Sequence, residues 1–400
     1  MYFIYYICAF VDKYPLYIHF NDFAKIPSNT LAQNIKKNMS RFHISLLSIA
    51  LLASILYVSC SSSSVPYTQN GNWVYRGDFN GSARSEAVSF VIGNTAYVGT
   101  GIDNNFTRYN DLWQLTVQGN NCSWFQVASA NAMTPRNSAV AFSVGGQGYV
   151  GSGTNGTVAF SDFWHYDPNA NAWNQIASLG DTTNGLAPRY DAIAFGIESV
   201  GKGYVGTGNN YTQYLKDFWE YDPASDTWTT KVSYDGTKRT AAVAWVYNNK
   251  GYLVTGLGTG GVVVNDFWVF DPSQPDSTAW TQLNHITNFS PESFDDGYTT
   301  IARYNAVAFV MTGVKTDGGG DKAFVTTGIN GSLYTWTWEY DLTNNVDLWT
   351  EKTPFERSAR QGAVGFTLEN RGFVALGISG ATNFEDLNEW HPDEVYNQQD

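Results

Sequence analysis

The chain has 400 residues, of which 15% are charged and 16% aromatic, and its formal net charge at pH 7 is −13. This acidic balance disfavours nucleic acid and anionic membrane surfaces as partners, because both attract lysine and arginine. Only Cys122 lies beyond residue 60, so the bulk of the chain has neither a disulfide framework nor a cysteine-rich metal site.

The first 60 residues differ in character from the rest. Residues 44–58 form an apolar run of 15 residues after Arg41, which is short for a membrane span and has the form of a signal peptide. A signal peptide belongs at the start of a chain, and one that begins at Met39 has the expected shape. Residues 1–38 are therefore interpreted as a mis-assigned N-terminal extension, and residues 39–60 as the signal peptide. A genuine but unusual leader is the alternative.

The apolar run ends in Tyr57-Val58-Ser59-Cys60, followed by four serines. This ending resembles the lipobox of bacterial lipoproteins, which implies that Cys60 is acylated and becomes the first mature residue. Tyr57 stands where that family prefers leucine, and ordinary signal cleavage is the alternative. Several acyl chains would anchor the protein stably, since each buried CH2 contributes about 0.8 kcal/mol. Residues 61–72 are expected to be a flexible tether.

A repeated pattern fills the remaining chain, residues 73–400. Each unit has an arginine, a short apolar strand, a second strand ending in glycine, a third strand of the type DFWxYDP and a fourth strand with a tryptophan. The arginines are spaced 50 to 64 residues apart: Arg84, Arg136, Arg189, Arg239, Arg303 and Arg360. Periods of this length indicate stacked supersecondary units, here six small sheets.

The two ends of the repeated region complement each other. The sixth unit reaches the C-terminus before a fourth-strand tryptophan, whereas Trp73 precedes the first arginine at the spacing of a fourth strand. A strand around Trp73 would complete the last sheet, close the ring and remove an exposed sheet edge. The sequence therefore predicts an all-β, six-bladed β-propeller whose N-terminal strand closes the last blade.

The units resemble kelch repeats over residues 73–392. One departure is that the family's double glycine after the second strand is here Gly-Thr-Gly, Gly-Ser-Gly or a single glycine. The fifth unit diverges most, because Trp336 replaces its aspartate. Two extended connections in this unit, residues 288–301 and 312–322, are expected to be loops.

The resemblance to kelch repeats also separates structural from variable positions. It implies that the repeated arginine bonds within its blade, to carbonyl groups or to the repeated aspartate. It further implies that the one or two residues after each arginine face the channel mouth. The candidate ligand-binding residues among these are Glu86, Asn137, Tyr190, Asp191, Tyr304, Asn305 and Gln361.

Such a rim of tyrosine, amide and carboxylate side chains suits a sugar or a peptide segment. An unoccupied, hydrated channel is the alternative. The connections between second and third strands add Asn104, Asn105, Asn209, Asn210 and Tyr211, although asparagine-rich loops are usually only turns.

Metal-dependent chemistry is not expected. Galactose oxidase-like propellers hold copper with histidine and tyrosine, but His165, His285 and His391 do not form a matched pair. The segment 317–321 lacks the alternating oxygen ligands of a calcium loop, and 295–297 has the composition of an exposed turn. Neither a metal nor a cofactor is predicted.

These observations favour a monomeric, non-catalytic propeller anchored to the bacterial outer membrane or cell surface. Its expected ligand is a glycan, a peptide or an envelope protein, and its only membrane contact is the lipid anchor. A periplasmic or secreted protein is the alternative location. The alternative function is a kelch-type sugar enzyme such as a sialic acid mutarotase, in which Glu86 and Asp191 would act with an arginine.

Overall fold

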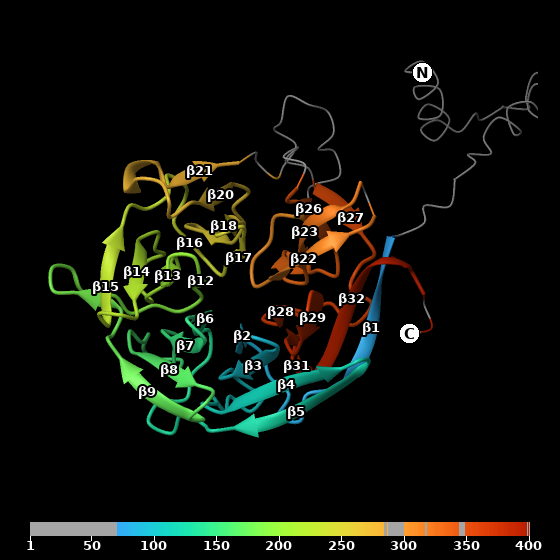
Figure 1. Cartoon of the computed structure of the whole chain (residues 1–400), viewed down its shortest axis with the longest axis horizontal. Helices are drawn as coiled ribbons and strands as arrows, with labels where there is room; N and C mark the ends of the chain where they lie inside the picture. Colours follow the sequence, from blue (N-terminus) through green and yellow to red (C-terminus); the bar gives the residue numbers. More distant parts are fainter. Residues whose placement is uncertain are drawn as a thin grey trace, which may run out of the picture. The chain divides into compact units, whose positions relative to one another are not determined.

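Six four-stranded antiparallel sheets surround a central axis in the computed structural model of the chain (Figure 1). The structure describes residues 70–283, 286, 300–316, 318–343, 349–397 and 399. In each sheet the first strand lies at the axis and the fourth at the rim. The predicted all-β six-bladed propeller is therefore confirmed.

The first three blades follow one another along the chain. Blade 1 contains β2 (Val88–Ile92), β3 (Thr95–Gly99), β4 (Leu112–Gln118) and β5 (Asn121–Val127). Blade 2 contains β6 (Val140–Val144), β7 (Gln147–Gly151), β8 (Phe163–Asp167) and β9 (Ala172–Ile176). Blade 3 contains β12 (Ile193–Ile197), β13 (Lys202–Gly206), β14 (Phe218–Asp222) and β15 (Thr227–Lys231).

The second half of the ring repeats this arrangement. Blade 4 contains β17 (Val243–Tyr247), β18 (Lys250–Val254), β20 (Phe267–Phe270) and β21 (Trp280–Gln282), with the short 3-10 helix η1 (Asp276–Thr278) before β21. Blade 5 contains β22 (Val307–Val314), β23 (Gly320–Thr326), β26 (Thr337–Asp341) and β27 (Trp349–Lys352). Blade 6 contains β28 (Val364–Leu368), β29 (Arg371–Ala375), β32 (Asp386–Val395) and β1 (Asn70–Asp78).

The N-terminal strand closes the ring as predicted. β1 pairs antiparallel with β32, and Trp73 lies opposite Trp390. The Trp73 side chain is 2% exposed and packs among Phe309, Phe355 and Trp390. The strand begins at Asn70, so the last three residues of the expected tether belong to the sheet. Cys60 and the leader lie outside the described residues.

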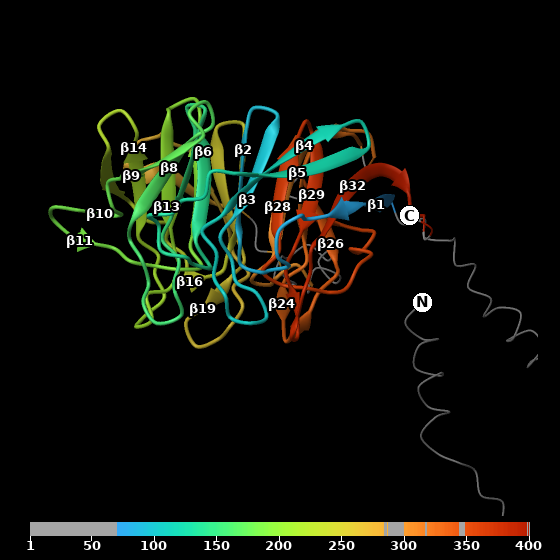
Figure 2. The ribbon, with the colours of Figure 1, turned by 90° about the horizontal axis from the view of Figure 1, so that it is seen from below.

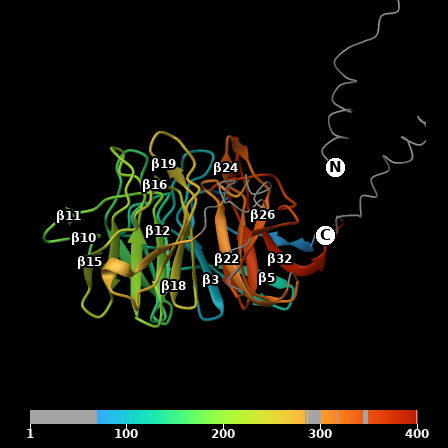
Figure 3. The ribbon, with the colours of Figure 1, turned by 90° about the horizontal axis from the view of Figure 1, so that it is seen from above.

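The two faces of the ring carry different connections (Figures 2 and 3). One edge carries the chain segments that lead into each first strand and the loops between second and third strands; we call it the mouth face. Its short ladders are β16 (Arg239–Thr240) with β19 (Leu257–Gly258), β24 (Ile329–Asn330) with β25 (Ser332–Leu333), and β30 (Ile378–Ser379) with β31 (Thr382–Asn383). The opposite edge carries the tight turns within each blade; we call it the hairpin face. A further ladder pairs β10 (Gly180–Asp181) with β11 (Gly185–Leu186).

Six hydrophobic clusters fill the spaces between neighbouring blades. Each sheet is covered on both sides, which explains why the strands carry aromatic side chains on both faces. A recurrent pair stacks an aromatic ring of the first strand on one of the second, as Phe142 does on Tyr149 at 4.8 Å between centroids. Gly203 of the next blade makes room for the Phe142 ring, because a Cβ there would lie 2.1 Å from it.

Blade 5 differs from the expectation that residues 312–322 form a loop. β22 continues to Val314 and β23 begins at Gly320, so only the middle of this segment connects strands. Met311 and Val314 are buried, and a register shift between them keeps both in the core. Buried apolar side chains thus extend a hairpin whose glycines suggested a loop. Among the described residues, no helix has the length and apolar character needed to cross a membrane.

Candidate functional site

The repeated arginines are structural, as predicted. All six side chains are buried, and five meet the aspartate that precedes the third strand of their own blade. The ion pairs are Arg84–Asp111, Arg136–Asp162, Arg189–Asp217, Arg239–Asp266 and Arg360–Asp386. Each arginine also donates to a carbonyl at the end of the second strand, for example Arg136 Nη1 to Ser152 O at 2.9 Å. These side chains hold the blade together and do not form an anion-binding mouth.

The residue two positions after each arginine forms a continuous ring around the axis. Its N–H donates to the carbonyl of the equivalent residue in the preceding blade, and six such bonds of 2.8 to 3.1 Å close the circle. We call these residues the axial ring: Glu86, Ser138, Asp191, Ala241, Asn305 and Gly362. The sequence placed these positions at the mouth, but not in a hydrogen-bonded circle.

All six ring residues have a left-handed backbone, with φ between 49° and 61°. This conformation is uncommon for residues other than glycine, and here it recurs at the same position of every blade. Residues held in such conformations persist where the surrounding structure over-determines them, and they cluster at binding and active sites. The closed circle of backbone bonds supplies that constraint.

A polar network connects the ring to the surrounding loops. The Ser138 hydroxyl donates to Glu86 Oε2 at 2.8 Å and also contacts the Asp191 carboxylate. Asn137 donates Nδ2 to the same Glu86 oxygen at 2.5 Å, and its own Oδ1 accepts from Arg108 Nε at 2.5 Å. Three of the predicted candidates, Glu86, Asn137 and Asp191, therefore belong to one hydrogen-bonded group.

Asp191 is the most perturbed acid of the mouth. Its side chain is half-buried. Burial, and then the neighbouring Glu86 carboxylate, raise the pKa of Asp191 to about 7, and the bond from Ser138 opposes this only in part. Two carboxyl groups that contact one hydroxyl are both charged only at a cost, and this cost adds to burial in raising the pKa of Asp191.

The other predicted candidates lie in two further groups. Tyr190 packs against Tyr211 with 4.8 Å between ring centroids, and burial raises the pKa of Tyr190 to about 12. On the other side of the ring, Asn305 Nδ2 donates to Gln361 Oε1 at 3.3 Å. Tyr304 is half-buried, and its backbone forms a β-bridge with that of Ile329, which belongs to β24 on the mouth face.

Most of the asparagines in the loops serve as turn formers. Asn209 Oδ1 accepts from the Tyr211 N–H at 2.7 Å, and Asn210 Oδ1 accepts from Thr212 and Gln213. Asn104 reaches across a blade boundary and accepts from the Asn383 N–H at 3.1 Å. These bonds account for the asparagines without a ligand.

Apart from Tyr211, the sequence analysis missed the apolar side chains at the tips of the mouth-face loops. Five blades each expose one large apolar residue in or next to the loop between their second and third strands. These loop-tip residues and their exposed fractions are Phe106 (79%), Val158 (51%), Tyr211 (47%), Val262 (68%) and Trp336 (36%). The sequence did contain a signal for them. An apolar residue within an asparagine- and glycine-rich loop is not needed to form the turn, so its presence indicates another role.

The channel beneath the ring is narrow. It encloses about 200 Å³ and is lined by the first residues of the six inner strands. An alanine directly follows every ring residue: Ala87, Ala139, Ala192, Ala242, Ala306 and Ala363. This volume is below the roughly 300–1,000 Å³ usual for small-molecule sites, so a larger ligand would have to bind above the ring.

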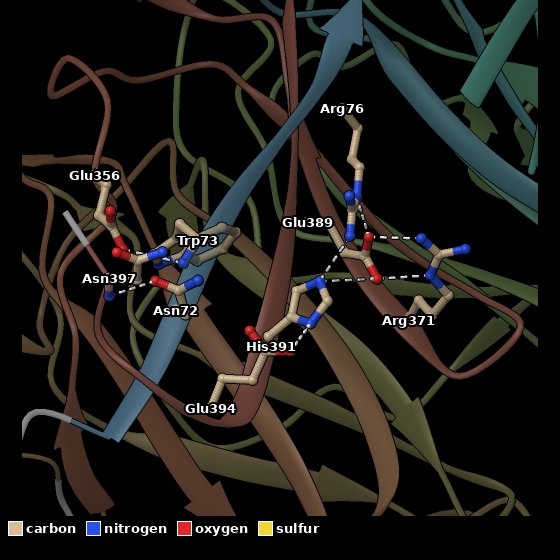
Figure 4. Close-up of polar contacts among 9 residues, drawn as sticks. All are labelled: Asn72, Trp73, Arg76, Glu356, Arg371, Glu389, His391, Glu394 and Asn397. Atoms are coloured by element: carbon tan, nitrogen blue, oxygen red, sulfur yellow. Dashed lines mark hydrogen bonds and ion pairs between the residues drawn. The ribbon is translucent and has the colours of Figure 1, made fainter. Parts of the chain in front are cut away.

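A second hollow of about 520 Å³ lies between blades 5, 6 and 1 on the hairpin face. At its side, Glu389 is surrounded by Arg76, Arg371 and His391, while His391 Nδ1 contacts Glu394 at 2.9 Å (Figure 4). These contacts join β1 to β29 and β32. The charged groups of this network pair with one another, and the network links β1, the strand that closes the ring, to its neighbours.

Within the part of the chain that the structure describes, no three histidine, cysteine or acidic side chains are placed to hold a metal ion. His165 lies on β8, the third strand of blade 2, and His391 belongs to the network of Glu389. His285, Asp317 and the acidic pair at 295–296 lie outside the described residues. Asp321 belongs to β23 and accepts from Tyr247 and from the Gly313 N–H.

Comparisons with known proteins agree with this architecture. Residues 72–238, which comprise the closing strand and the first three blades, match the family model of the KLHDC2/KLHL20/DRC7 Kelch-repeats domain. The solved structure of YjhT is similar in fold, with a TM-score of 0.60 and 14% identity over 78% of this chain and 95% of that chain. No curated protein sequence gives a match.

Proposed function

We propose that this kelch-repeat six-bladed β-propeller is a non-catalytic binding module of the bacterial envelope, which takes a glycan, a peptide or a protein segment on its mouth face. The supporting observation is the ring of exposed apolar loop tips around a polar centre. Exposed large apolar residues that gather on one face, with polar groups between them, are typical of binding surfaces. The arginines are buried and the alanines line the narrow channel, which leaves the mouth as the variable, accessible part of the repeat.

The position of the N-terminal strand fits an anchored protein. Asn70 pairs with Val395 and Asp78 with Asp386, and Asp386 receives Arg360 near the mouth. β1 therefore starts at the end of the blade that is remote from the mouth face. A tether from an acylated Cys60 would enter at that end, so the mouth would be free to meet a ligand.

The anchor has its own experiment. We expect the chain to incorporate labelled palmitate and to fractionate with membranes, and Cys60→Ser to abolish both. Labelling that persists in the variant, or a protein that is soluble with Cys60 intact, would refute the anchor without affecting the binding proposal.

Ligand binding is tested by exposing the full chain to glycan and peptide arrays. We expect Phe106→Ser together with Tyr211→Ser to weaken the strongest signals by about tenfold, because each loop tip would lose buried apolar area. Phe125→Ser is the matched control, since Phe125 is 53% exposed on the outer strand of blade 1. Equal loss in the control and the mouth variants would contradict the proposal.

A sugar enzyme is the second candidate, favoured by the pKa of Asp191 near 7 beside Glu86. A carboxyl that titrates near neutrality can exchange a proton with a bound sugar. NMR would follow the anomeric equilibration of free N-acetylneuraminic acid with the protein and with Asp191→Asn. If the parent protein accelerates the equilibration and the variant does not, the enzyme proposal replaces the non-catalytic one. If the equilibration rate is the same with and without the protein, the non-catalytic proposal stands.

A further inference from the structure

Polar and small residues alternate around the axial ring. Blades 1, 3 and 5 contribute Glu86, Asp191 and Asn305, whereas blades 2, 4 and 6 contribute Ser138, Ala241 and Gly362. Because the six residues are linked in one closed circle, the three larger polar residues occupy alternate positions, a triangle of backbone positions around the axis, and the Glu86 and Asp191 carboxylates both reach the Ser138 hydroxyl between them. Each of the three carries at least one oxygen acceptor.

We infer that this triangle receives the ammonium group of a lysine side chain presented by a peptide segment, which rests on the proposed function of the mouth face. An ammonium group carries three N–H donors arranged around its carbon–nitrogen bond, and it has no acceptor. A side chain that approaches along the axis would therefore direct one donor to each corner. Arginine fits this arrangement poorly, because the guanidinium donors lie in one plane.

The charges around the triangle favour a cation. Glu86 and Asp191 both contact the Ser138 hydroxyl. The cation of this network, Arg108, bonds to Asn137 and not directly to either carboxylate. The Asn305 amide uses an N–H to reach Gln361, and that bond leaves its oxygen as an acceptor. Two carboxylates and an amide oxygen would thus surround an incoming positive charge, in a chain whose net charge of −13 attracts cations over longer distances.

The shape of the mouth selects a side chain over a sugar. The channel below the ring has only about 200 Å³ between alanine, valine and other uncharged side chains, which leaves little room for a bulky group beneath the ring. An unbranched stem with a terminal charge can reach the ring, while a pyranose ring with its hydroxyl groups requires a wider cavity. The exposed loop tips Phe106, Val262 and Trp336 lie on the same face and would contact apolar residues that flank the lysine.

The experiment measures binding of the full chain, purified in mild detergent, to a heptapeptide pool with lysine fixed at the centre and uncharged residues elsewhere. The matched pool carries Nε-acetyl-lysine at the same position. We expect acetylation to weaken binding about tenfold or more, because it removes the charge and two donors. Glu86→Gln and Asp191→Asn should each produce a similar loss, and both retain side-chain shape.

Glu394→Gln is the control variant, because Glu394 is exposed on the hairpin face, far along the blade from the ring. Its binding should equal that of the parent. If a ring variant fails to fold, as judged by its melting temperature, the comparison of the two peptide pools still decides.

Four results would overturn the inference. Equal binding of the acetylated pool, or neutral glycan binding that Glu86→Gln and Asp191→Asn leave intact, would refute lysine recognition while retaining a mouth-face binding function. Absence of binding to peptides and to glycans alike would refute both. Preference for an amino sugar over the lysine pool would also reject the peptide segment as the occupant.

Discussion

Arg303 Nη1 donates to the Trp336 carbonyl oxygen at 2.8 Å, in the position where the other five arginines meet a carboxylate. The guanidinium is fully buried, and burial lowers the pKa of Arg303 to about 9. Among the described residues its hydrogen-bond partners are carbonyl groups, including that of Thr327 at 2.7 Å, and the Tyr334 ring lies 5.0 Å from the guanidinium carbon. Blade 5 thus holds the same arginine as its neighbours, with no carboxylate partner among the residues that the structure describes.

Trp336→Asp should therefore stabilise the propeller. The new carboxylate would stand at the position of the aspartate in the other blades and accept charged hydrogen bonds from Arg303, contributing about 1–3 kcal/mol. Thermal unfolding measures the change, with Trp336→Asn as the neutral control. An aspartate variant no more stable than the asparagine variant would show that the carbonyl groups already satisfy Arg303.

Gly203→Ala should destabilise the contact between blades 2 and 3. The added Cβ would lie 2.1 Å from the Phe142 ring, which is 3% exposed and packed within the cluster between these blades. Overpacking of this kind costs about 1–3 kcal/mol. Denaturant unfolding provides the measurement. The double variant Gly203→Ala with Phe142→Leu should recover part of the loss, and failure to recover any would assign the effect to the backbone instead.

Asp191→Asn should make the protein more stable at alkaline pH. The folded-state pKa of about 7 lies above the usual value for an aspartate, so between about pH 4 and 7 the folded protein keeps a proton that the unfolded chain releases. Stability of the parent therefore falls as pH rises through this range. We expect the melting temperature of the variant to exceed that of the parent at pH 8 and to approach it at pH 4. The reverse order would contradict a raised pKa for Asp191 in the folded protein.

The closing strand should show a pH dependence set by Glu389 and His391. Burial alone would raise the pKa of Glu389, but Arg371, His391 and Arg76 hold it far below its usual range; contact with Glu389 raises the pKa of His391. The Glu389 contribution is present above the unfolded-state pKa and is lost as pH falls, whereas the His391 contribution is present below the unfolded-state pKa of about 6.5 and is lost as pH rises.

Closure should accordingly be most stable between about pH 5 and 6.5. Amide hydrogen exchange of β1 across this range tests the expectation, with His391→Asn as the variant. The variant should lose the decline in protection above pH 6.5 and keep the decline at acid pH. A decline above pH 6.5 that persists in the variant would assign it to another group.

The repeat alone was sufficient to predict the propeller, the number of blades and the closure by Trp73. Each unit must bury both faces of its sheet, so the residues that recur in every unit indicate which groups contact each other. The arginine contacts the aspartate, and a glycine lies where an aromatic ring approaches. Arg136 with Asp162 could be anticipated in this way, because both residues recur at fixed spacing. The full length of β22 could not be anticipated, since its last residues extend the strand through the burial of Met311 and Val314 against other segments.

The sequence also determined which positions vary at the mouth, because only residues without a packing role differ between copies. The tertiary structure decided how those positions combine. Closure of the ring brings Glu86 and Asp191, 105 positions apart in the chain, to the same serine hydroxyl and thereby raises the pKa of one of them. That proximity comes from the circular arrangement of the blades, in which blades 1 and 3 both flank Ser138 of blade 2, and no local pattern in any one repeat encodes it.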